Sequence, residues 1–177
     1  PLNMYDTSVK VPAIISGPGV ARAGCVCENM LSQYDIMPTF LELAGVRNPG
    51  ADALPGSPFL DLLNGQETDE SREAVVVYDE YGPVRMIRTH RWKYVHRYPC
   101  GPHELYDLVN DPGEVYNLVD LEKYGEKVDE LRNRLENWFR RYTDVDLDGR
   151  HEAVTGRGQY GWAGRRAGGK SNYSPPM

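Results

Sequence analysis

The segment from residue 84 to residue 118 constrains the fold most, because it alternates extended stretches with strong turn signals. Residues 84–89 are rich in β-forming side chains, and residues 90–91 stand at the expected reversal. Side chains then alternate with the two-residue period of a strand, so that one face holds Trp92, Tyr94, His96 and Tyr98 and the other holds Lys93, Val95 and Arg97. After a break at residues 100–102, extended structure resumes at Glu104–Leu108. These local connections predict a small antiparallel sheet.

A tight acidic turn is expected at Asp111-Pro112-Gly113, with Pro at its second position and Gly at a later position that needs positive φ. Residues 74–78 predict a further strand that joins the sheet. The longest helix is expected from about Asp120 to Tyr142, where an apolar stripe should pack on the sheet, made of Val128, Leu131, Leu135, Trp138 and Tyr142.

The first part of the chain predicts buried α/β structure. Residues 11–15 fit a strand that is buried on both faces, and such a strand needs covering layers that the short N-terminal segment cannot supply. This favours a larger α/β body. A helix is predicted over Asp35–Ala44, with Asp35 as its N-cap and Gly45 ending it in the left-handed conformation. A second, shorter helix is expected to have Ser57 as its cap and to stop at Gly65.

Composition narrows the classes of function. A net charge of −6 and a pI near 5.2 argue against a nucleic-acid partner. No apolar run approaches the roughly 20 residues that span a bilayer. The chain starts at Pro1, so the lack of a visible leader is uninformative. The odd count of 3 cysteines favours free thiols over a zinc site. Free thiols in turn favour a cytoplasmic location over a periplasmic or secreted one.

From Thr143 onward the composition changes, because glycines are interleaved with arginines and no periodicity persists. Residues 143–177 are therefore expected either to be disordered or to form an arm that docks on a partner subunit or on a missing body. The run Asp144–Gly149 resembles the start of a calcium loop, but Thr155 stands where the closing Glu is needed. We predict no calcium site there.

Histidines are the main candidates for chemistry. His103 lies in an irregular segment at the end of a hairpin, where rigid scaffolds commonly present binding groups, so it is a candidate for substrate contact. His96 shares a strand face with aromatic residues and is more typical of a core edge, and His90 fits a solvated turn. No local signature pairs a serine or cysteine nucleophile with a histidine.

Several motifs together resemble those of type I sulfatases. The segment Glu104–Leu108, followed by Asn110–Glu114 and Asn117-Leu118, resembles the ELYDL-x-NDP-x-E-x-x-NL signature near the C-terminus of that family. Three more segments are similar to family motifs and follow in the family's order, namely residues 11–19 (VPxII-x-GPG), residues 35–39 (D-x-x-PT) and residues 88–94 (RT-x-x-WKY).

The resemblance implies an α+β fragment of an alkaline-phosphatase-like α/β enzyme, with a small antiparallel sheet of about four strands packed on one long C-terminal helix. Residues 1–70 would be the C-terminal segment of the large domain, residues 71–142 the C-terminal subdomain and residues 143–177 a Gly/Arg-rich tail. The family's formylglycine and calcium are expected in the parent enzyme and not in this chain. Cys100-Gly101-Pro102-His103-Glu104 departs from the formylglycine motif and lies at the wrong end of the family order.

The function implied is hydrolysis of sulfate esters by the parent enzyme, with this fragment inactive alone. Its substrate would be a sulfated small molecule or glycan, contacted by His103 and, after it, by His96 and Arg97, because the C-terminal hairpin can border the pocket in this family. Two alternatives stay open. One is a phosphonate monoester or phosphodiester hydrolase of the same superfamily, and the other is a non-catalytic binding or assembly module, with a homo-oligomer formed through the tail.

Overall fold

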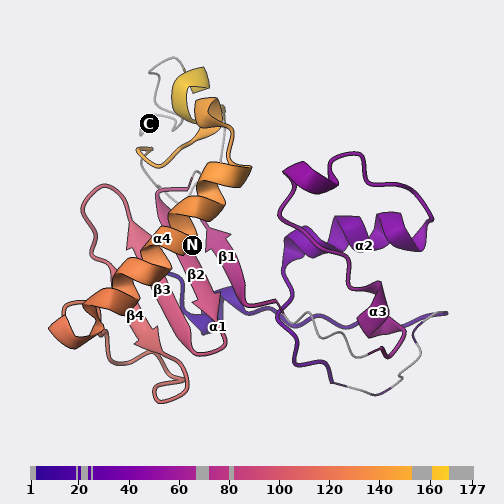
Figure 1. Ribbon diagram of the computed structural model, residues 1–177, viewed down its shortest axis with the longest axis horizontal. Coiled ribbons are helices and arrows are strands. Elements are labelled where there is room, and N and C mark those ends of the chain that lie inside the picture. The colour runs from indigo at the N-terminus through magenta and orange to yellow at the C-terminus, as the bar shows by residue number, and fades with distance from the viewer. Residues whose placement is uncertain are drawn as a thin grey trace, which may run out of the picture. The chain divides into compact units, whose positions relative to one another are not determined.

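The computed structural model describes residues 3–18, 20, 24, 26–66, 72–79, 82–152 and 161–167. The chain divides into two compact units, Val11–Val75 and a sheet unit that joins Pro1–Lys10 to Val76–Met177 (Figure 1). The sequence predicts that residues 1–70 are the C-terminal segment of a large domain. The structure groups the first ten residues with the sheet instead, because Met4 is buried in the core of that unit.

Four strands form the sheet, in the order β1 (Ala74–Tyr78), β2 (Val84–Thr89), β3 (Trp92–Arg97) and β4 (Glu104–Asp107) (Figure 1). The pairs β2–β3 and β3–β4 are antiparallel, with Val84 opposite Arg97 and Tyr94 opposite Leu105. The strand order follows the chain order, so the predicted sheet of local connections is confirmed.

One face of the sheet is covered by α4 (Gly125–Tyr142), which a short 3-10 turn at Glu122–Tyr124 precedes (Figure 1). Leu131 and Leu135 of the predicted stripe are fully buried. Phe139 was missed by that stripe, yet it is also buried, and its ring lies 5.5 Å from that of Tyr78. The sheet therefore packs on the helix through residues spaced four apart.

The opposite face is covered by the N-terminal segment, which includes α1 (Asp6–Val9). Met4 is completely buried in a cluster with Val84, Met86 and Val95, and Val9 packs against this cluster. Apolar burial of this kind contributes roughly 2 kcal/mol for each large side chain. It explains why the N-terminal residues belong to the sheet unit.

The unit Val11–Val75 contains α2 (Ile36–Leu43) and α3 (Leu60–Leu63). Asp35 stands at the predicted N-cap position of α2, but its side chain makes no capping hydrogen bond there. The Asp35 carboxylate instead accepts hydrogen bonds from the backbone N–H of Ser32 at 2.7 Å and of Ser57 at 2.9 Å, and it pairs with Arg72. Ser57 does not cap α3, which begins at Leu60. As predicted, Gly45 and Gly65 follow the two helices, and Gly45 has a positive φ of 66°; the φ of Gly65 is also positive, at 78°.

Two further predictions are corrected by the structure. Residues 11–15 form no strand, and Ile14 is 93% exposed, because no strand in the described part of the chain lies beside them. In the acidic turn, the N–H of Glu114 donates to the carbonyl of Asp111, and the residue with positive φ is Glu114 rather than Gly113.

The tail is described at residues 143–152 and 161–167, and the rest of residues 143–177 lies outside the described residues. Its described part holds two 3-10 turns, Val145–Leu147 and Gly164–Ala167, which contact each other. Asp148 joins it to the sheet, because Arg85 Nη2 donates to Asp148 Oδ1 at 2.6 Å. Within the described ranges, no helix combines the length and apolar character needed to cross a membrane.

Candidate functional site

The three residues that the sequence proposed for substrate contact meet at the bend after β3. His96 is only 3% exposed, its Nδ1 lies 2.8 Å from the Tyr94 hydroxyl, and its ring stacks on that of His103 with centroids 4.1 Å apart. The backbone N–H of Arg97 donates to His103 Nδ1 at 3.3 Å. The Arg97 guanidinium donates to the Pro102 carbonyl at 2.8 Å and pairs with Glu104 at 2.9 Å.

The electrostatics of the bend keep both imidazoles neutral near pH 7. Burial, with smaller contributions from the neighbouring His103 and Arg132, lowers the pKa of His96 to about 4. Burial also lowers the pKa of His103, with smaller contributions from Arg132 and Arg97. A neutral imidazole can donate one hydrogen bond and accept another, but it offers no positive charge to an anion. Arg97 is therefore the only cation of the three candidates.

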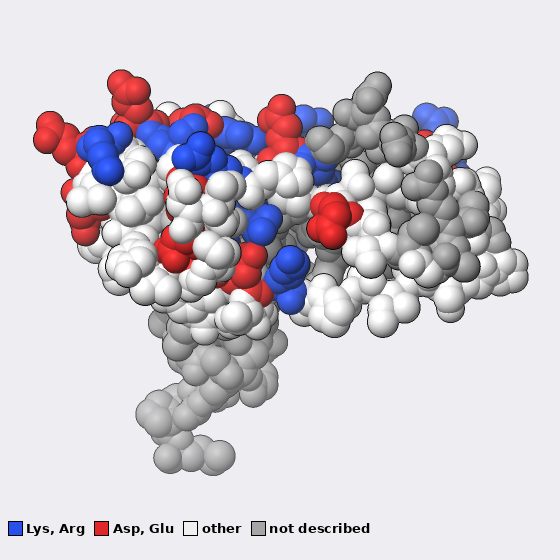
Figure 2. Space-filling view, turned by 90° about the horizontal axis from the view of Figure 1, so that it is seen from below, with Lys and Arg blue, Asp and Glu red and all other residues white. Residues whose placement is uncertain are grey.

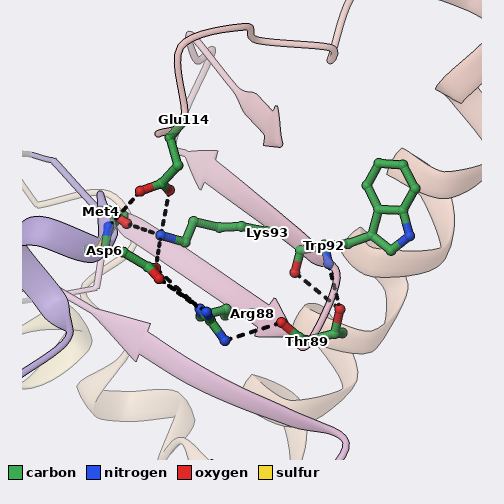
Figure 3. Close-up of polar contacts among 7 residues, drawn as sticks. All are labelled: Met4, Asp6, Arg88, Thr89, Trp92, Lys93 and Glu114. Carbon is green, nitrogen blue, oxygen red and sulfur yellow. Dashed lines mark hydrogen bonds and ion pairs between the residues drawn. The ribbon is translucent and has the colours of Figure 1, made fainter. Parts of the chain in front are cut away.

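Sequence reasoning missed a second cluster, on the face of the sheet opposite α4. Figure 3 shows Lys93 pointing at the N-terminal segment and at the loop that follows β4. Its Nζ donates to the Met4 carbonyl at 3.0 Å and pairs with the carboxylates of Asp6 and Glu114. The Lys93 side chain is 0% exposed and that of Glu114 only 3% exposed.

Arg88 and a main-chain bond complete this Lys93 cluster, which consists of Met4, Asp6, Arg88, Lys93 and Glu114 (Figure 3). Arg88 pairs with Asp6 at 3.0 Å, and the Asp6 N–H donates to Glu114 Oε2 at 2.6 Å. Burial opposes ionisation of Asp6, but hydrogen bonds from Arg88 and Lys93 outweigh it and hold the pKa of Asp6 below its usual range.

The Lys93 cluster acts as a structural clamp. Two cations face two carboxylates, so no charged group in it is left over for a nucleophile or a general base. An open depression of about 480 Å³ lies beside it, lined by Asp6, Thr7, Lys10, Arg88, Leu108 and Pro112. One feature of the sequence could have indicated this cluster. The two-residue alternation of β3 places Lys93 on the same face as Val95, and the fold buries that face.

The described residues do not fit the calcium ion that the sulfatase resemblance implies for the parent enzyme. No group of three or more His, Cys, Asp or Glu side chains in the described ranges is arranged to hold a metal ion. The acids that resemble a calcium loop are engaged by arginines, since Asp148 pairs with Arg85 and Arg150. Where Figure 2 shows charged side chains, acidic and basic ones lie beside one another.

Comparisons with known proteins add the family context. The family described as N-sulphoglucosamine sulphohydrolase, C-terminal, matches residues 2–141. The Delta 4,5-hexuronate-2-O-sulfatase of Bacteroides thetaiotaomicron is 34% identical over 163 residues, covering 84% of this chain and 34% of the relative. The chain spans between 27% and 35% of the length of this and two other curated relatives.

Two solved structures resemble the chain. One is a protein in complex with its substrate D-glucosamine-2-N,6-O-disulfate, with a TM-score of 0.53 and 31% identity, covering 64% of this chain and 25% of that one. The other is the phosphonate monoester hydrolase of Agrobacterium radiobacter, with a TM-score of 0.50 and 26% identity, covering 70% of this chain and 27% of that one.

Proposed function

We propose a function from the premise that this chain belongs to the N-sulphoglucosamine sulphohydrolase C-terminal family and is a C-terminal portion of a sulfatase. The longer protein hydrolyses sulfate esters of saccharides. The observation that carries the proposal is the family match over residues 2–141, which includes the sheet and most of α4. The alkaline-phosphatase-like superfamily also contains the phosphonate hydrolase neighbour, so the reaction class needs its own test.

In this proposal the chain supports catalysis without performing it. The charged residues of its Lys93 cluster are paired with one another. The unit Val11–Val75 exposes apolar side chains such as Ile14 and Phe40. Exposed apolar surface of this kind is expected where the remainder of a larger enzyme covers it. The formylglycine nucleophile and the calcium ion would belong to that remainder, and the chain alone is inactive.

We propose a sulfated sugar as the substrate class. The supporting observations are that one relative is a hexuronate 2-O-sulfatase and that a sugar disulfate is bound in a structural neighbour. Among the three candidates, His103 is the one that we assign to substrate contact, with Arg97 beside it. The burial of His96 favours a role in holding the His103 ring, on which it stacks.

The test compares the 177-residue chain with the longer protein that we propose contains it. Sulfate release from a sulfated disaccharide and from an aryl sulfate is measured for both, with calcium present. We expect turnover by the longer protein and none by the chain above a heat-treated control. Turnover by the chain alone would overturn the proposed inactivity.

The phosphonate monoester hydrolase neighbour supports a second candidate reaction. A panel that pairs an aryl sulfate with an aryl phosphonate ester of the same leaving group discriminates the two. A kcat/KM that is higher for the phosphonate ester would replace the sulfatase proposal.

An assembly role of the tail is the other candidate function. Size-exclusion chromatography of the chain with and without residues 143–177 tests it, because an unchanged oligomeric state would contradict this role.

A further inference from the structure

The described tail segments, residues 143–152 and 161–167, form a packed platform that lies outside the family match, which ends at residue 141. Gly164 has a φ of 63°, and a Cβ added there would lie 2.9 Å from the backbone oxygens of Asp146 and Asp148. Its N–H donates to Glu152 Oε1 at 3.3 Å, and the adjacent Ala163 is only 4% exposed. The turn at residues 161–167 is therefore packed closely on the turn at residues 144–148.

The platform is attached to the sheet unit by a buried cation. Arg85 is 1% exposed, its Nε donates to the Gly82 carbonyl at 2.7 Å, and its guanidinium lies 3.7 Å from the centre of the Phe139 ring on α4. Because Asp148 neutralises Arg85, detaching the tail would leave a buried charge without its carboxylate. The attachment holds the position of the turns relative to the sheet.

On this platform an indole and two guanidinium groups are presented to solvent. Trp162 is 60% exposed although Ala163 beside it is buried. The Arg166 guanidinium lies 5.4 Å from the Trp162 ring centre, within the range of a cation–π contact. The Arg165 side chain is 78% exposed and that of Arg166 is 50% exposed.

The ion pairs of these arginines are loose. Arg165 lies 3.6 Å from Asp146 and Arg166 lies 3.6 Å from Asp144, and both carboxylates are about half exposed. Exposed pairs of this kind contribute about 0–1 kcal/mol, so an incoming anion can replace them. A sulfate group accepts two parallel N–H donors from one guanidinium, and an exposed indole offers a flat apolar face to a sugar ring.

We propose that Trp162, Arg165 and Arg166 form an auxiliary binding site for a sulfated saccharide, with the sugar ring on the indole and the sulfate on the guanidinium groups. The choice of ligand rests on the proposed sulfatase function, while the site itself rests on the platform. It holds saccharide near the enzyme and takes no part in hydrolysis. Asp146 and Asp144 compete with the sulfate for Arg165 and Arg166, so they limit the affinity of the site for the saccharide.

The experiment titrates the 177-residue chain with a disaccharide that carries N-sulfate and 6-O-sulfate groups, by isothermal titration calorimetry. We expect Trp162→Ala and the double variant Arg165→Ala/Arg166→Ala each to weaken binding by about tenfold, which is about 1.4 kcal/mol. The matched control is Arg140→Ala/Arg141→Ala, which removes the same charge from exposed positions on α4 and should change affinity less than about twofold.

A variant that is expected to tighten binding, rather than weaken it, makes the test stricter. Asp144→Asn/Asp146→Asn removes the competing carboxylates, keeps a side-chain acceptor at the cap of the turn, and should tighten binding several-fold. No binding of the sulfated disaccharide, equal binding of its unsulfated form, or equal weakening by the α4 control would each overturn the site. These results do not depend on turnover. A longer protein that releases sulfate while the chain fails to bind leaves the sulfatase proposal standing and removes only this site.

Discussion

Lys93 is a buried cation whose burial depends on two carboxylates, so its removal has a defined cost. Lys93→Met leaves Glu114 buried without its cation, and we expect a loss of about 3–5 kcal/mol in the free energy of unfolding, measured by urea denaturation. Adding Glu114→Gln removes the orphaned charge and should restore part of the loss. Lys127→Met is the control, because its pair with Glu130 is exposed and worth less than about 1 kcal/mol.

An equal loss from Lys93→Met and Lys127→Met would contradict the assignment of Lys93 as a clamp. A double variant as unstable as Lys93→Met would also contradict it, since the cost is attributed to the uncompensated carboxylate. The sequence could not supply this result. It showed a lysine on the second face of a strand, but Met4 and Asp6 lie far away along the chain and reach it only in the fold.

His96 makes stability depend on pH. Its pKa is about 4 in the folded protein against 6.5 ordinarily, so between these values the unfolded chain binds more protons. The contribution of His96 to the free energy of unfolding is therefore fully present above pH 6.5 and is lost as pH falls towards 4. Each pKa unit is worth about 1.4 kcal/mol, so the loss is on the order of 3 kcal/mol.

The measurement is thermal or urea unfolding across this pH range. His96→Gln keeps an acceptor for the Tyr94 hydroxyl and should flatten the slope, whereas His90→Gln changes an exposed turn residue and should leave it unaltered. Titration of His103, whose pKa is also lowered, adds to the slope in the same direction. An unaltered slope in His96→Gln would show that another group carries the dependence.

At the scale of elements, the sequence predicted what local patterns determine. The alternation of β3 and the turn at residues 90–91 depend on neighbouring residues, and both are confirmed. Failures occurred where a distant partner decides the outcome. Asp35 is a good N-cap by type, but Ser57 and Arg72 occupy its carboxylate, and residues 11–15 need neighbouring strands that the described residues do not supply.

The packing of α4 on the sheet gives a prediction for this element. Leu135 is completely buried, so Leu135→Ala removes apolar contacts and leaves a cavity between the helix and the sheet. We expect a loss of about 2–5 kcal/mol in the free energy of unfolding, measured by urea denaturation. Val109→Ala is the control, because Val109 is 66% exposed. A loss for Leu135→Ala no larger than that for the control would contradict the packing.

At the scale of the whole molecule, the sequence identified the family but not the surfaces. The signature around Glu104–Leu118 is built from turn and core residues, such as Asp111 and the buried Leu105, so it can be read without knowing the fold. The structure brings the three candidate substrate residues together at one bend. Their charge states could not be read from the sequence, because burial in the fold and the proximity of Arg132 determine them.

The apolar surface of Val11–Val75 gives the last prediction. Ile14 is 93% exposed and Phe40 is 64% exposed, and side chains of this kind favour association when nothing covers them. We expect the isolated chain to self-associate as its concentration rises in sedimentation velocity, and the double variant Ile14→Glu/Phe40→Glu to weaken this association. Val109→Glu/Val115→Glu is the matched control, because it places the same charges on exposed apolar positions of the sheet unit. A chain that stays monomeric, or a control that acts as strongly, would show that the surface of Val11–Val75 does not drive association.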